Sequence, residues 1–435
     1  MSTTVLAGIM IFGLLLLFLA IGFPIAIGIL LSALFTLLLI LPFDTTILTG
    51  AQRLVTEMNS FTMLAIPLFV LAGIIMNNGG IAFRLINFAK VLVGRIPGSL
   101  AHTNVVGNML FGSIAGSSVA SAAAMGRIMG PMQENSGYDR KYAAATNIAS
   151  APSGLLIPPT SILIVYSLVS GGTSIAALFM AGYIPGILWG LTTMAVAYVF
   201  AKKYKYPVSE SIPWRDKLFL TLDALPSLML IVIVIGGIVS GIFTATEGAA
   251  VAVIYSTVLS LIYRNLKVKD ISEIIKETVE ITGMILLLIT ASGLFSLVMS
   301  YTGLPDAMSE GLLGLTENPI LILLLMNVFL LAVGTFMDIT PAVLIFTPIF
   351  LPIATAMGID PIHFGIILTF NLCIGNITPP VGSALFVGAS VADIRIEKVV
   401  PMLIPFFIAL LIMLVIVTFT PFFSMFLPDL FGLTQ

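Results

Sequence analysis

Stretches of about 20 consecutive apolar residues recur along the whole chain, and each is long enough to cross the hydrocarbon core of a bilayer as one helix. Residues 5–41, 218–241 and 400–426 are clear examples. Only 9% of the 435 residues are charged, whereas soluble domains carry about 25%. The sequence therefore predicts an all-α polytopic membrane protein with no separate soluble domain.

Positive charge is concentrated in five short segments, which hold 16 of the 18 Lys and Arg residues. They are residues 84–95, 140–141, 202–217, 264–276 and 395–398. An even number of crossings, or a re-entrant hairpin, separates each segment from the next. All five can therefore lie on one side of the membrane, which the positive-inside rule makes cytoplasmic.

A shift of 221 residues brings two hydrophobic halves of the chain into register, so that Pro158 and Pro159 fall on Pro379 and Pro380. The halves are residues 1–221 and 222–435. The charge pattern places the equivalent amphipathic arms on opposite sides of the membrane, which predicts inverted repeats. Such repeats are typical of alternating-access transporters that bind their substrate at the bilayer midplane.

Each half is expected to contain two scaffold helices, an interfacial helical arm, a re-entrant hairpin and a discontinuous helix. In the first half these are residues 5–41, 44–58, about 99–133 and about 142–171. In the second half they are residues 222–264, 267–280, about 319–357 and about 361–392, followed by a last helix at 400–426.

Backbone interrupted at membrane depth survives only where protein or a water-filled cavity surrounds it. The Pro-Pro loops should leave carbonyls unpaired, and a hairpin tip rich in Gly, Ser and Thr lies upstream of each loop, at residues 112–121 and 334–341. Carbonyls that converge in this way suit sodium, and hydroxyl groups can complete the shell. One ion site in each half is therefore predicted.

The half-helices that restart after these breaks expose free N–H groups, which attract anions. Ser117, Ser161 and Thr340 are good residues for such helix starts. Asp338 is an intramembrane carboxylate, predicted to accept hydrogen bonds from substrate or to neighbour a sodium ion, although a structural role is the alternative. Arg127 could face a substrate carboxylate, or it could extend to the cytoplasmic surface.

These features resemble the large membrane subunit (DctM/SiaM-like) of tripartite ATP-independent periplasmic (TRAP) transporters over the whole length of the chain. The resemblance lies in the breaks IPPTS and TPPVGS, the tips FGSIAGSSVAS and GTFMDITPA, and the motif NNGGIAFRL. It is closest to the sialic-acid branch. The resemblance implies an elevator-type transporter of the bacterial inner membrane that takes up an organic anion with two or more sodium ions.

The resemblance also implies which residues bind ligands. The first sodium site would comprise Gly112, Ser113, Gly116, Gly154, Ile157 and Pro159. The second would comprise Gly334, Thr335, Gly375, Thr378 and Val381. Substrate contacts would be Ser117, Ser161 and Asp338.

The implied partners are a small four-helix membrane subunit on a separate chain, a periplasmic substrate-binding protein, the organic anion and the lipid bilayer. No nucleic acid partner is expected, and no cofactor beyond the coupling sodium ions. Sialic acid (N-acetylneuraminate) is the expected substrate. The alternatives are a C4-dicarboxylate or another organic acid, and a stand-alone sodium/dicarboxylate symporter of related fold.

Two other classes of protein fit the sequence less well. An enzyme is not expected, because the chain has no H-E-x-x-H motif, no paired intramembrane aspartates and no P-loop. A passive channel would conduct anions regardless of external sodium, and uptake through this chain is expected to require sodium.

Overall fold

The computed structural model describes residues 3–209, 212–316 and 318–434, and within these ranges it contains helices and turns but no strand. Among these residues, eight helices are long and apolar enough to cross a membrane. The bent pair Arg140–Leu156 and Ser161–Val169 would add a ninth span. The predicted all-α polytopic fold is confirmed.

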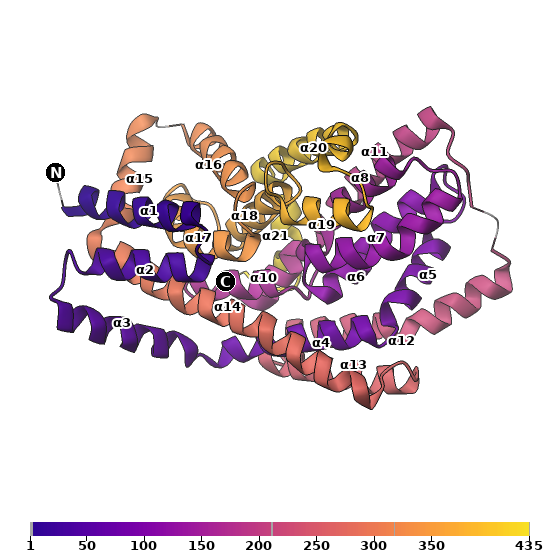
Figure 1. The fold of residues 1–435 in the computed structure, drawn as a ribbon, viewed down its shortest axis with the longest axis horizontal. Coiled ribbons are helices and arrows are strands. Elements are labelled where there is room, and N and C mark those ends of the chain that lie inside the picture. The colour runs from indigo at the N-terminus through magenta and orange to yellow at the C-terminus, as the bar shows by residue number, and fades with distance from the viewer. Residues whose placement is uncertain (1–2, 210–211, 317, 435) are drawn as a thin grey trace.

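One group of helices forms a scaffold, in which α4 packs against α13 and α2 against α14. Figure 1 shows α14 running diagonally between α2 and α13. The members are α1 (Thr3–Ile21), α2 (Ile25–Leu37), α3 (Phe43–Met58), η1 (Phe61–Leu64), α4 (Ala65–Asn78), α5 (Ile81–Val93), α12 (Trp214–Val239), α13 (Ala245–Ile262), α14 (Val268–Thr302) and α15 (Leu304–Leu315).

The second group contains the hairpins and the interrupted helices. Its first-half members are α6 (Ser99–Ala115), α7 (Ser118–Asn135), α8 (Arg140–Ser150), α9 (Ser153–Leu156), α10 (Ser161–Val169) and α11 (Ile175–Tyr204). Its second-half members are α16 (Pro319–Gly334), α17 (Ile339–Ala356), α18 (Pro361–Gly375), α19 (Ser383–Val391), α20 (Ile396–Phe419) and α21 (Phe422–Leu430). The pairs α6/α7 and α16/α17 are the two hairpins.

Two expected elements differ from those observed. The arm at residues 267–280 is the first part of α14, a continuous helix of 35 residues, because no proline follows it to interrupt the ladder of hydrogen bonds. The expected last helix at 400–426 is divided between α20 and α21. The division falls at Pro421, which cannot donate the backbone hydrogen bond that would continue α20. The inverted orientation of the two halves stays a prediction.

The positively charged segments meet at one end of the molecule. Tyr206 Oη accepts a hydrogen bond from the backbone N–H of Asp139 at 3.3 Å, which joins the second segment to the third. Residues of the second and fifth segments line one open hollow of about 600 Å³. This arrangement agrees with a common cytoplasmic side for these segments.

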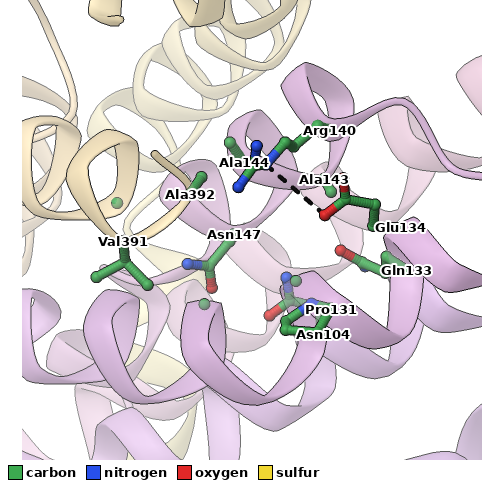
Figure 2. A pocket seen from close by; sticks show the side chains of 13 residues that line it. Asn104, Pro131, Gln133, Glu134, Arg140, Ala143, Ala144, Asn147, Val391 and Ala392 are labelled. Carbon is green, nitrogen blue, oxygen red and sulfur yellow. Dashed lines mark ion pairs between the residues drawn. The ribbon is translucent and has the colours of Figure 1, made fainter. Parts of the chain in front are cut away.

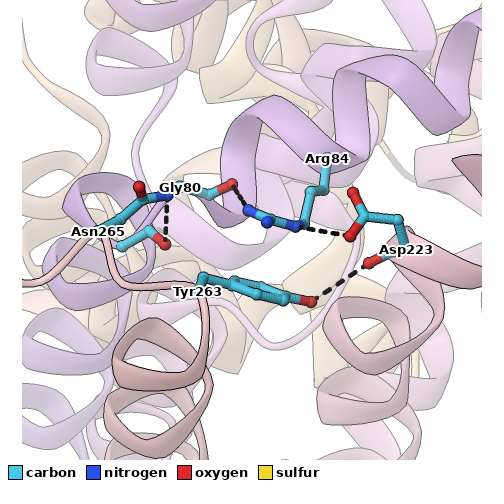
Figure 3. Close-up of polar contacts among 6 residues, drawn as sticks. Gly80, Arg84, Asp223, Tyr263 and Asn265 are labelled. Atoms are coloured by element: carbon cyan, nitrogen blue, oxygen red, sulfur yellow. Dashed lines mark hydrogen bonds and ion pairs between the residues drawn. The ribbon is translucent and has the colours of Figure 1, made fainter.

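Arg84, in the NNGGIAFRL motif, fastens α5 to α12 and α13 at this end (Figure 3). Its Nε donates to Asp223 Oδ1 at 3.1 Å, and its Nη1 donates to the Gly80 carbonyl at 3.1 Å. The guanidinium carbon lies 3.4 Å from the centre of the Tyr263 ring. The motif therefore holds the turn between α4 and α5 against α12 and α13.

Replacing this guanidinium with an uncharged side chain of similar length is expected to destabilise the protein. Arg84→Met should lower the free energy of unfolding by roughly 2 kcal/mol, because a charge-assisted hydrogen bond and a cation–π contact are lost together. The thermal unfolding midpoint in detergent measures the effect. Lys276→Met is the control, because the pair Lys276–Glu280 is exposed and spans 3.8 Å. Equal midpoints for the two variants would contradict the assigned role.

Candidate functional site

The first hairpin turns at Gly116 and Ser117. Gly116 has a φ of +61°, which glycine adopts without steric cost. Ser117 is the N-cap of α7, and its Oγ accepts a hydrogen bond from the Ala120 N–H at 3.2 Å. The predicted helix start at Ser117 is therefore present, and the first turn of α7 offers N–H groups to an anion.

The first interrupted helix packs backbone to backbone against this hairpin. A Cβ placed on Gly154 would lie 2.2 Å from the Gly112 Cα and 2.6 Å from the Ser113 nitrogen. Ser113 is buried, and its hydroxyl donates to the Leu110 carbonyl at 2.9 Å. Only glycine at both contact positions permits this approach.

The carbonyls beyond Gly154 are available to a ligand. Among the described residues, no backbone N–H donates to the carbonyls of Ile157, Pro158 or Pro159. Both Pro-Pro bonds, Pro158–Pro159 and Pro379–Pro380, are cis. Pro158 is buried, and Ile157 and Pro159 are partly buried. Carbonyl oxygens without donors suit a hard cation, so the residues expected for the first sodium site fit that ion.

The second hairpin turns at Asp338, which is the N-cap of α17 but makes no side-chain capping bond. Its Oδ1 instead accepts hydrogen bonds from Ser383 Oγ at 3.0 Å and from Asn376 Nδ2 at 3.2 Å. Thr340, expected at the helix start, lies inside α17 because Asp338 takes the capping position. Similarly, Ser161 is the first residue of α10, after the N-cap Thr160.

The second interrupted helix gathers the residues expected for the second sodium site. A Cβ on Gly375 would lie 2.5 Å from the Gly334 Cα. The Thr335 carbonyl already accepts the N–H groups of Val381 and Gly382, each at 3.2 Å, so its two lone pairs are occupied. The Thr378 hydroxyl donates to the Ile374 carbonyl, and the Val381 side chain is exposed. Among the described residues, no backbone N–H donates to the carbonyls of Thr378, Pro379 or Pro380, so the second loop also offers carbonyl oxygens to a cation.

Asn376 connects the two halves of the site, and its role was not predicted. Its Oδ1 accepts from Ser118 Oγ at 3.0 Å, and its Nδ2 donates to Ser383 Oγ at 2.6 Å as well as to Asp338. The position of Asn376 in an apolar segment could have indicated this role, because a buried amide at membrane depth requires hydrogen-bond partners.

A cavity of about 270 Å³ lies between the two tips and the scaffold helices α4 and α14. Ser117, Ser161, Asp338 and Thr340 line one wall, and these four also border an adjoining hollow of about 70 Å³. The opposite wall carries two polar residues, Asn77 and Glu277. The predicted substrate contacts Ser117, Ser161 and Asp338 therefore share one cavity.

Arg127 is the exception among the predicted substrate contacts. It is exposed on α7, and the described residues that line the cavity do not include it. Ten residues of helix separate it from Ser117, a rise of about 15 Å. The structure therefore places Arg127 apart from the other predicted contacts, and its role toward the substrate stays a prediction.

Removing the cap hydroxyl at the first tip is expected to weaken substrate binding. Ser117→Ala should raise the apparent KM of uptake about fivefold, which corresponds to about 1 kcal/mol for a lost N-cap beside the anion. Ser174→Ala is the matched control, because Ser174 caps α11 through Ala177 and does not line the cavity. Unchanged KM and maximal rate for Ser117→Ala would leave that serine with a packing role only.

In the comparison with known proteins, a family model and individual relatives agree on one family. The family model described as "Tripartite ATP-independent periplasmic transporter, DctM component" matches residues 12–423. The protein YgiK of Salmonella typhimurium is 53% identical over 98% of each chain. The sialic acid TRAP transporter large permease protein SiaM of Vibrio cholerae is 39% identical, covering 94% of this chain and 96% of its own.

Two further comparisons concern substrate and fold. The C4-dicarboxylate TRAP transporter large permease protein DctM of Pseudomonas aeruginosa is also 39% identical, over 93% of this chain and 94% of its own. The crystal structure of the Alcanivorax borkumensis YdaH transporter superposes with a TM-score of 0.63 at 14% identity, covering 87% of this chain and 89% of that one. That structural likeness concerns the fold alone.

The relatives span nearly the whole chain, and the family model covers both hairpins and both interrupted helices. Eight helices among the described residues can cross a membrane. The chain belongs to the DctM component family of tripartite ATP-independent periplasmic transporters, as a multi-pass large permease of an organic acid in the inner membrane and not as an enzyme.

Proposed function

We propose that this permease couples sodium entry to the uptake of a small organic anion, because the cavity itself carries no positive side chain to balance that anion. The described lining residues include the carboxylates of Asp338 and Glu277 and contain no Lys, Arg or His. An anion beside these carboxylates at low dielectric would be repelled. Sodium bound near Gly112 and Gly154 supplies positive charge, together with the N-termini of α7 and α10.

The same lining favours a hydroxylated monocarboxylate such as sialic acid over a C4-dicarboxylate. A second substrate carboxylate would meet Asp338 or Glu277, whereas a hydroxyl or amide group can donate hydrogen bonds to Asp338. The relatives named for sialic acid and for C4-dicarboxylates are equally identical to this chain. We therefore base the proposal of a hydroxylated monocarboxylate on the chemistry of the cavity. A C4-dicarboxylate is the alternative substrate.

The position of the cavity supports an elevator mechanism. One wall belongs to the hairpin tips and the other to scaffold helices α4 and α14. Sliding the hairpin group along the scaffold would carry the bound ligands across the membrane. Membership of this family implies a small membrane subunit and a periplasmic binding protein. In this proposal the small subunit is a separate four-helix chain, and the binding protein delivers the substrate.

Replacing external sodium with potassium tests the coupling. Uptake of radiolabelled N-acetylneuraminate into proteoliposomes that contain the permease, its small subunit and its binding protein should fall by more than about tenfold in potassium. Sodium should also raise the unfolding midpoint of the purified permease, because a ligand stabilises the state that binds it. Equal uptake in both salts would refute coupling.

The same proteoliposomes distinguish the proposed function from its alternatives. Uptake of radiolabelled succinate without uptake of radiolabelled N-acetylneuraminate would favour a dicarboxylate substrate. Robust uptake by the permease alone, without the binding protein, would favour a stand-alone symporter.

A further inference from the structure

A second cavity, which is partly open, lies at the base of the first hairpin, at the end away from its tip. It has a volume of about 70 Å³ and is bordered by α6, α7, α8 and α19. Figure 2 shows Asn104, Gln133 and Asn147 around this space, with Glu134 and Arg140 at one side. None of its described lining residues borders the substrate cavity.

Two polar atoms in this cavity have no hydrogen-bond partner in the described part of the chain. They are Asn104 Nδ2 and Gln133 Oε1, and their side chains are only 1% and 0% exposed. Buried polar groups almost always find a partner. The space can hold about two water molecules at about 30 Å³ each. The cavity is therefore suited to water or to a small hydrated ion.

Polar side chains continue from this cavity toward the hairpin tip. Asn104 and Asn108 lie one turn apart on α6, and Asn108 Nδ2 donates to Asn104 Oδ1 at 3.2 Å. Asn108 Nδ2 also donates to Asn147 Oδ1 at 3.0 Å and to Ser150 Oγ at 2.7 Å on α8. Asn104, Asn108 and Asn147 form what we term the asparagine ladder, and all three are buried.

The ladder ends beside the residues expected for the first sodium site. Ser121 Oγ donates to Asn108 Oδ1 at 2.7 Å. A Cβ placed on Gly112 would lie 3.3 Å from that same Ser121 oxygen. The eight residues from Asn104 to Gly112 rise by about 12 Å along α6. Amide and hydroxyl oxygens therefore connect the cavity to the Gly112–Gly154 contact.

The outer end of the cavity faces the positively charged side of the molecule. Arg140 Nε lies 3.7 Å from Glu134 Oε2, and both side chains are about half exposed. Arg140 also lines the open hollow of about 600 Å³ that Lys141, Arg395 and Lys398 border. This side is cytoplasmic by the distribution of Lys and Arg.

We propose that the sodium ion of the first site leaves for the cytoplasm along the asparagine ladder, separately from the organic anion. The proposal rests on the sodium coupling proposed above. The ladder offers an oxygen about every helical turn, so a partly hydrated cation keeps ligands as it moves. The narrow cavity excludes an organic acid, which has the larger cavity beside α4 and α14.

A plug in the narrow cavity tests this route without touching the ion site. A Cβ on Gly130, which lines the cavity, would meet nothing within 4 Å, so Gly130→Leu can extend into the space. The matched control is Gly236→Leu on α12, where a Cβ also meets nothing within 4 Å and which does not line this cavity.

Sodium release is followed by stopped-flow fluorescence after rapid dilution of the ion. Trp189 is a local reporter, because its Nε1 donates to the Ala149 carbonyl at 2.8 Å, next to Ser150. The chain has two tryptophans, so Trp214→Phe leaves Trp189 alone. Gly130→Leu should slow release by about tenfold or more. The sodium midpoint of thermal stabilisation should stay within about twofold of the parent value.

A second variant removes the polar groups instead of filling the space. Asn104→Leu should also slow release, and Thr146→Val is its control, because Thr146 is buried on α8 but does not line the cavity. Release at the parent rate in Gly130→Leu and Asn104→Leu overturns the route, as does equal slowing in the controls. If sodium neither stabilises the parent protein nor changes its fluorescence, the sodium coupling itself fails, which is a distinct result.

Discussion

Gly154→Ala is expected to abolish transport and to destabilise the permease. The added Cβ would lie 2.2 Å from the Gly112 Cα and 2.3 Å from its carbonyl carbon. These are backbone atoms of another helix, so the collision cannot be relieved by rotating a side chain. Helix α9 must move away from α6, which should lower the free energy of unfolding by about 3 kcal/mol. It should also separate the Gly112 and Gly154 sides of the predicted first sodium site.

Thermal unfolding and proteoliposome uptake together measure this effect. Gly13→Ala is the control, because a Cβ at that position meets nothing within 4 Å. Gly375→Ala should resemble Gly154→Ala, since its Cβ would lie 2.5 Å from two Gly334 backbone atoms. A Gly154→Ala protein with the parent midpoint and parent uptake would show that α6 and α9 do not need this close contact.

Asp338→Asn is expected to reduce uptake by about 10- to 100-fold while the protein stays folded. The two side chains are nearly the same size, so Ser383 and Asn376 can still donate to the remaining oxygen. The oxygen that becomes an NH₂ group can no longer accept hydrogen bonds from substrate, and the negative charge is lost. One hydrogen bond to a charged group accounts for about 1.5–3 kcal/mol, which gives that range of rates.

The comparison variant for this experiment is Asp216→Asn, in the exposed first turn of α12. It removes the same charge away from the cavity and should leave uptake unchanged. Initial rates and unfolding midpoints are measured for both proteins. Near-parental uptake by Asp338→Asn would exclude a direct role in transport, whereas a large fall in its midpoint would assign Asp338 a structural role.

The local chemistry of the sequence predicted the helix start at Ser117, and the family resemblance named Ser161 and Asp338 as substrate contacts, which the structure places by one cavity. A serine at a hairpin tip and an aspartate in an apolar segment can each be recognised from a few neighbouring residues of the sequence. Arg127 lies outside that cavity, because ten residues of helix separate it from Ser117.

Other features depend on contacts that no local pattern contains. Asn376 meets Ser118 across 258 residues of chain, and Ser383 meets Asp338 across 45. The asparagine ladder likewise forms only when α6 packs on α8, which brings Asn108 to Asn147. A buried amide needs a hydrogen-bond partner, but the register of helix packing determines which residue becomes that partner.

The sequence by itself determined that this chain resides in a membrane, which ends of its helices are positively charged, and where the backbone is interrupted. These properties follow from apolar length, from Lys and Arg, and from proline and glycine, all of which act on the nearest residues. Only the tertiary structure decided which polar groups meet, how the substrate cavity is bounded and which narrow cavity adjoins the first hairpin. Those outcomes depend on how distant helices pack, and close packing converts small differences of side-chain volume into the presence or absence of a cavity.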